Sequence, residues 1–129
     1  MPGWLLTAVT IAIVLWLTLA RTPLPDNDLP AIPGLDKVVH AVMFAGVTAV
    51  LWLDWRMACR HRLSRWQASA CALAAVALGG LIEMAQDAMG MGRTADMADF
   101  IADIIGGAGM LAAIGLWLRS SPTGAGRRQ

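Results

Sequence analysis

Four long apolar stretches constrain this chain more than any other feature of its sequence. They cover residues 4–20, 38–53, 66–85 and 100–118, each about 16–20 residues long. A helix that rises ~1.5 Å per residue needs about this length to cross a hydrocarbon layer roughly 30 Å thick. Because lipid offers no hydrogen-bond partners to an exposed backbone, segments that cross it must be helical. The sequence therefore predicts an all-α fold, a polytopic membrane bundle of about four transmembrane helices.

The composition agrees with this prediction. Hydrophobic residues make up 57% of the chain and charged residues only 15%, whereas soluble domains carry about 25% charged residues. Tryptophans lie at the ends of the stretches, at positions 4, 52, 55, 66 and 117, as is typical of membrane–water interfaces. The net charge of +1 gives no indication of a nucleic-acid partner. Cys59 and Cys71 lack a CxxC spacing, so we expect free thiols.

We expect one transmembrane domain over residues 1–119 and a flexible cytoplasmic tail over 120–129. The first stretch could be a signal peptide. However, no lysine or arginine precedes it and residues 18–20 form a poor cleavage site, so an uncleaved span is favoured. The second stretch is short and should extend outward through Asp36 and Lys37. The linker 21–35 holds four of the prolines and should be irregular.

Arginines predict the orientation of the bundle. Four lie in the linker 54–65 and three follow the fourth stretch. In a four-span chain these two segments are on the same side, and the positive-inside rule makes that side cytoplasmic, with both termini inside. The protein is therefore expected in a plasma membrane, and nearly all its acidic residues fall on the outer side or in the outer half of a span.

These outer acids form three sets that could share one pocket. Asp36 and His40 are four residues apart, on one helix face. Glu83 and Gln86 are three apart near the outer end of the third span. Asp96, Asp99 and Asp103 run into the fourth span at spacings of three and four, and Arg93 lies just before them. The topology brings the three sets to one membrane depth.

A structural role is an alternative for each of these residues. Asp36 could be an ordinary acid at a helix N-terminus, and His40 a hydrogen-bonded interior histidine. Arg93 and Asp96 could form a surface ion pair, worth ~0–1 kcal/mol. Glu83 and Asp103 are harder to explain this way, because a charged side chain within the membrane costs at least ~2.5–3.5 kcal/mol.

The order of these motifs resembles the VanZ-like family of membrane proteins. Residues 36–40 resemble the family's D-K-x-x-H, residues 83–86 its E-x-x-Q, and residues 92–99 its G-R-x-x-D-x-x-D. The similarity covers about residues 35–116. Asp103 departs from the pattern, because the family commonly has asparagine there. The resemblance implies a bacterial inner-membrane protein of the cell envelope, related to low-level resistance to the lipid-tailed glycopeptide teicoplanin.

The first functional hypothesis is a site that acts on or binds a lipid-linked envelope precursor at the outer leaflet. His40 would be general base or nucleophile, oriented by Asp36, and Glu83 a second acid or base. The substrate would be bound by Arg93, Gln86, Asp96, Asp99 and Asp103. A metal variant would use ligands from Asp36, His40, Glu83 and Asp99. The sequence names no cofactor, metal or oligomeric state.

Two alternatives do not require an enzyme. The polar cluster could be a network that fixes the packing of the helices, or a binding surface for a lipid or partner protein. A weaker alternative is proton-coupled transport through Glu83 and Asp103.

Overall fold

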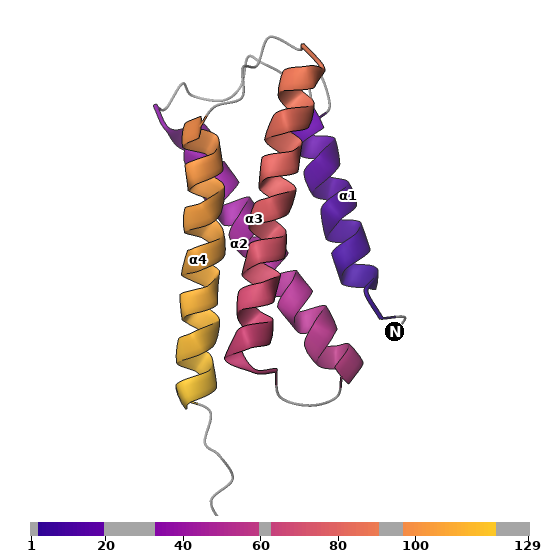
Figure 1. Cartoon of the computed structure of the whole chain (residues 1–129), viewed down its shortest axis with the longest axis vertical. Helices are drawn as coiled ribbons and strands as arrows, with labels where there is room; N and C mark the ends of the chain where they lie inside the picture. Colours follow the sequence, from indigo (N-terminus) through magenta and orange to yellow (C-terminus); the bar gives the residue numbers. More distant parts are fainter. Residues whose placement is uncertain (1–2, 20–32, 60–62, 91–96, 121–129) are drawn as a thin grey trace, which may run out of the picture.

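The computed structural model describes residues 3–19, 33–59, 63–90 and 97–120, which form four helices and no strand (Figure 1). The helices are α1 (Leu5–Leu19), α2 (Leu35–Cys59), α3 (Arg65–Ala88) and α4 (Met97–Ser120). The last three are each long and apolar enough to cross a membrane, while α1 is apolar but has only 15 residues. The predicted all-α membrane bundle is confirmed.

The helices are longer than the apolar stretches that predicted them. α2 begins at Leu35 and so includes Asp36 and Lys37, as expected. It also continues to Cys59, which corrects the assignment of residues 54–59 to a linker. Arg56 in its last turn favours this extension, because a cation stabilises the negative end of the helix dipole. Ser120, assigned to the tail, still belongs to α4. The rest of the tail and most of linker 21–35 lie outside the described residues.

Local sequence signals set both ends of α3. The Ser64 hydroxyl accepts a hydrogen bond from the Gln67 N–H, and the Gln67 side chain accepts one from the Ser64 N–H. This capping box satisfies two N–H groups that the helix leaves unpaired. After the last turn, Gly90 has a φ of +60°, a left-handed conformation that glycine adopts without steric cost.

The core consists of two apolar clusters stacked along the bundle. One joins α1, α2 and α3 and is made of Val14, Phe44, Val47, Ala75 and Ile82. The other joins α2, α3 and α4 and is made of Trp52, Leu63, Ala68, Cys71 and Ile114. Large apolar side chains such as Val42 and Ile105 stay exposed, as expected of surfaces that face lipid rather than water.

The helix order places helix ends of opposite direction together at each end of the bundle. The first turns of α2 and α4 lie at the same end of the bundle as the last turns of α1 and α3, at the top of Figure 1. The ends of α2 and α4 and the start of α3 lie at the bottom. α2 makes its most extensive contact with α4, and α1 packs mainly against α2. The acids in the first turns of α2 and α4, Asp36 and Asp99, therefore lie at one end of the bundle. The arginines in the last turns of the same helices, Arg56 and Arg119, lie at the other end, as the sequence predicted.

Candidate functional site

His40 and Asp103 form the centre of the polar cluster. The His40 Nδ1 lies 3.0 Å from Asp103 Oδ1, which joins α2 to α4. The side chain of His40 is 13% exposed and that of Asp103 only 1%. The pair is therefore held inside the bundle, where a carboxylate can fix both the orientation of the imidazole and the nitrogen that carries its proton.

Asp36 does not make the contact with His40 that its spacing suggested. Its carboxylate lies 3.2 Å from Lys37 Nζ, and its side chain is 60% exposed. Lys37 Nζ also lies 3.4 Å from Asp99 Oδ1 on α4. Asp36 is in the first turn of α2, at the rim of the bundle, so the more deeply placed Asp103 takes the role of orienting His40. Lys37 thus joins the two acids across α2 and α4.

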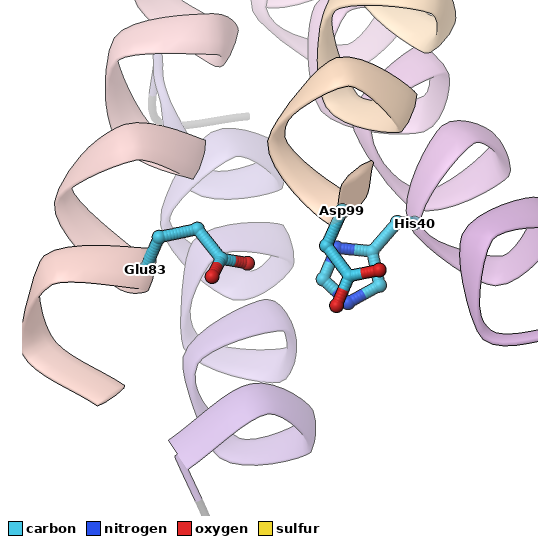
Figure 2. A group of neighbouring side chains, drawn as sticks. All are labelled: His40, Glu83 and Asp99. Atoms are coloured by element: carbon cyan, nitrogen blue, oxygen red, sulfur yellow. The ribbon is translucent and has the colours of Figure 1, made fainter. Parts of the chain in front are cut away.

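Glu83 comes to the same place from α3. Figure 2 shows its carboxylate reaching from α3 toward the His40 ring and the Asp99 carboxylate. One ligand atom from each of these three residues lies within 4.8 Å of the others. Glu83 is 7% exposed, so its carboxylate is held within the bundle. Three helices thus contribute a histidine and two carboxylates to one small volume.

This group could hold a divalent cation. One imidazole nitrogen and two carboxylate oxygens are a donor set that suits Zn²⁺ and related ions. Histidines that bind metals usually donate their other ring N–H to a carboxylate, and Asp103 is placed to accept such a bond from Nδ1. Of the metal ligands expected from sequence, His40, Glu83 and Asp99 come together, whereas Asp36 is paired with Lys37.

Gly79 makes room for the Asp103 side chain. A Cβ atom at Gly79 would lie 2.6 Å from Asp103 Oδ2 and 3.2 Å from Phe44. Among the described residues, Asp103 Oδ2 has no hydrogen-bond partner, although it is fully buried. Glycine at position 79 therefore allows α3 to close over a carboxylate whose second oxygen is left without a donor.

Gln86 is used in a contact between helices. Its side-chain Nε2 donates a hydrogen bond of 2.8 Å to the carbonyl oxygen of Thr18, near the end of α1. Gln86 is 7% exposed, and this bond satisfies one of the carbonyl groups that the last turn of a helix leaves unpaired. Its predicted role in substrate binding stays a prediction. Arg93 and Asp96, the other predicted binding residues, lie outside the described residues.

Sequence reasoning missed a third buried acid, Asp54, at the opposite end of the bundle from Glu83 and Asp103. Asp54 is 2% exposed. Its Oδ2 accepts hydrogen bonds from the N–H and the hydroxyl of Thr7, at 2.8 and 2.7 Å. Thr7 is in the first turn of α1, so a carboxylate from α2 caps the positive end of α1. The available signal was one acid within the run Leu-Trp-Leu-Asp-Trp, residues 51–55.

No family model, curated protein or solved structure matches this chain. Its function must therefore be inferred from the geometry of the polar cluster and from the motifs that form it.

Proposed function

We propose that this chain is a VanZ-like protein of the bacterial inner membrane, whose polar cluster binds the charged headgroup of a lipid-linked envelope component at the outer leaflet. The convergence of His40, Glu83, Asp99 and Asp103 from three helices carries this proposal. Their motifs are far apart in sequence. Placing ionisable side chains within a membrane costs free energy, so several of them that meet at one point are typical of a functional site.

The chemistry of the cluster suits a headgroup with hydroxyl and phosphate groups. Lys37 at the rim is already paired with Asp36 and Asp99, so Arg93, which the sequence hypothesis assigns to substrate binding, would supply the cation for a phosphate. Carboxylates deeper in the site can accept hydrogen bonds from sugar or peptide groups. Exposed apolar side chains of α2 and α4, such as Val42 and Ile105, would contact the lipid tail.

If the site is catalytic, His40 is the natural general base. Asp103 would orient it and stabilise its protonated form, as carboxylates do for catalytic histidines on other folds. Glu83 would donate a proton to the leaving group from the opposite helix. The sequence hypothesis instead had Asp36 orient His40 and counted Asp103 among the substrate-binding residues.

The proposed orientation places the cluster outside the cytoplasm. Arginines gather at the other end of the bundle, where α2 ends, α3 begins and α4 ends. The positive-inside rule then assigns that end to the cytoplasm and the cluster to the outer leaflet.

A structural network is the second candidate. The buried Gln86–Thr18 bond supports it, as does the close fit of Asp103 against Gly79. Under this candidate the polar groups would only fix the register of the helices. It predicts that stability and phenotype fall together when the cluster is changed.

The test compares wild type with His40→Ala, Glu83→Gln and Arg93→Ala. Asp87→Asn is the matched control, because Asp87 is an exposed acid one turn beyond Glu83. Each variant is expressed in a teicoplanin-sensitive host. Three quantities are measured: the amount of folded protein in the membrane, its thermal unfolding in detergent, and the susceptibility of the host.

We expect the three site variants to stay folded and abundant while they lose the protection that wild type and Asp87→Asn provide. Native mass spectrometry of the purified proteins should show weaker binding of a polyprenyl phosphate in the same variants. Loss of folded protein in parallel with every loss of protection would favour the structural network instead. Unchanged binding and unchanged protection in all three would refute the proposed site.

A further inference from the structure

A groove between α3 and α4 lies at the end of the bundle opposite the polar cluster. It has a volume of about 400 Å³ and is lined mainly by small and aliphatic side chains, including Ala68, Leu111, Ala112 and Gly115. Arg65, at the start of α3, and Arg119, in the last turn of α4, complete its lining. The groove is therefore apolar along the helices and cationic at the end.

The two arginines are available to a ligand. Both are exposed, and neither forms an ion pair with a residue that the structure describes. Arg56, from the same end of the bundle, differs in this respect. Its guanidinium lies 5.3 Å from the centre of the Trp52 ring and 4.7 Å from that of Trp117, so its charge is already stabilised by aromatic rings.

The surroundings of the groove are those of a membrane interface. Trp66, next to Arg65, is 75% exposed, and exposed tryptophans at helix ends lie at the level of the lipid headgroups. Leu116 is 64% exposed and presents an apolar surface to the lipid chains. A ligand that fits must join an anionic group, at the level of the arginines, to an apolar chain that follows the helices inward. An anionic phospholipid has this shape and charge.

We propose that Arg65 and Arg119 bind the phosphate of an anionic phospholipid, whose acyl chain fills the α3–α4 groove. Guanidinium groups form strong, charge-assisted hydrogen bonds with phosphate oxygens. Basic pockets between transmembrane helices are known sites for anionic headgroups. With the proposed orientation, the lipid belongs to the cytoplasmic leaflet. The binding itself requires only the groove and its two arginines, so it does not depend on the function of the polar cluster.

The glycines of α4 allow the groove to be tested separately from the charges. Gly115 lines the groove and a Cβ atom there would meet no atom within 4 Å, so Gly115→Leu adds a side chain to the groove without a clash at its Cβ. Gly109 also has open space around it but does not line the groove. Gly109→Leu therefore controls for the added side chain. Arg56→Gln controls for the loss of one positive charge at the same end of the bundle.

The experiment measures binding of phosphatidylglycerol, and of phosphatidylcholine for comparison, to the purified full chain by native mass spectrometry. We expect wild type, Gly109→Leu and Arg56→Gln to retain phosphatidylglycerol in preference to phosphatidylcholine. Each of Arg65→Gln and Arg119→Gln should weaken phosphatidylglycerol binding about five-fold. Gly115→Leu should weaken the binding of both lipids. Circular dichroism confirms that each variant is folded.

Three results would overturn the proposal. The first is phosphatidylglycerol binding that is unchanged in the double variant Arg65→Gln with Arg119→Gln. The second is an equal loss in Arg56→Gln, which would mean that the basic end attracts anionic lipid without a specific site. The third is a wild-type dimer that Gly115→Leu dissociates while phosphatidylglycerol binding is unchanged, because a second copy of the chain would then fill the groove.

Discussion

Replacing Gly106 by alanine should push α4 away from α2 and separate the two residues at the centre of the polar cluster. A Cβ atom at position 106 would lie 2.8 Å from the carbonyl carbon of Ala41 and 2.9 Å from its Cα, and closer still to its carbonyl oxygen. Carbon atoms in good contact are about 3.5–4.0 Å apart. The obstacle is backbone, so the helices must separate by at least about 0.7 Å to bring the shorter contact to 3.5 Å.

That displacement acts directly on the His40–Asp103 bond. His40 precedes Ala41 on α2, and Asp103 lies one turn before Gly106 on α4. Adding about 0.7 Å to the 3.0 Å between His40 Nδ1 and Asp103 Oδ1 takes the two atoms beyond the range of a hydrogen bond. Overpacking costs ~1–3 kcal/mol and the lost hydrogen bond ~1 kcal/mol. The better helix propensity of alanine returns up to ~1 kcal/mol. Gly106→Ala should therefore lower the free energy of unfolding by ~1–3 kcal/mol.

Gly109→Ala is the control, because it gains the same helix propensity without a steric clash. It should leave the free energy of unfolding unchanged or raise it by up to ~1 kcal/mol. Both variants are measured in detergent by titration with a denaturing detergent, followed by circular dichroism. If Gly106→Ala proves as stable as Gly109→Ala, the close contact of α2 with α4 at this position is wrong, and with it the geometry of the site.

Three further predictions concern the other polar contacts. Asp54→Ala should lower the free energy of unfolding by ~1.5–3 kcal/mol, because it leaves two buried donors of Thr7 unsatisfied. Asp54→Asn keeps an acceptor, so an equal loss of stability in both variants would contradict the capping of α1 by Asp54. Gln86→Leu should lower the free energy of unfolding by ~0.5–1.5 kcal/mol and leave the binding of polyprenyl phosphate unchanged. Unchanged stability with weaker polyprenyl phosphate binding would instead make Gln86 a binding residue. Zn²⁺ at about one hundred times its Kd should raise the free energy of unfolding of wild type by ~2.7 kcal/mol but not that of His40→Ala, and an equal rise in both would exclude the His40 ligand set.

The fold could be predicted from the sequence because the length and apolar composition of a stretch are enough to identify a membrane-spanning helix. Membrane-spanning helices need no tertiary partner to be recognised, and α2, α3 and α4 follow from three of the stretches. Their ends were less predictable, because polar residues continue a helix beyond the hydrocarbon layer. Residues 54–59 show this, since the run from Asp54 to Cys59 is helical although it looked like a basic linker.

The sequence named the residues that gather in the polar cluster but not their pairings, and two other residues that it named, Asp36 and Gln86, contact different groups. The gathering of His40, Glu83, Asp99 and Asp103 at one end follows from topology, which alternates the direction of successive spans. The partner of His40 depends instead on how α4 is rotated and shifted against α2, and glycines set that register. Spacing along one helix favoured Asp36, but a contact between helices decided the pair.

The same reasoning explains why Asp54 was overlooked. Its partner Thr7 is 47 residues away, and both belong to helices that looked ordinary in isolation. A charged group that caps another helix can be recognised only when the crossing of the two helices is known.

The energetic cost of the polar cluster favours a site over a structural network. A buried ionic pair is a weak stabiliser, because the cost of removing two charges from water offsets most of their attraction. Apolar side chains could join α2 and α4 as well, and those of the cluster that contains Trp52 and Ile114 do so. Asp103 also keeps one buried oxygen without a donor among the described residues, which a network selected for stability alone would avoid. The arrangement is explained more simply if Asp103 orients His40, and if His40 and the side chains around it are retained for a ligand.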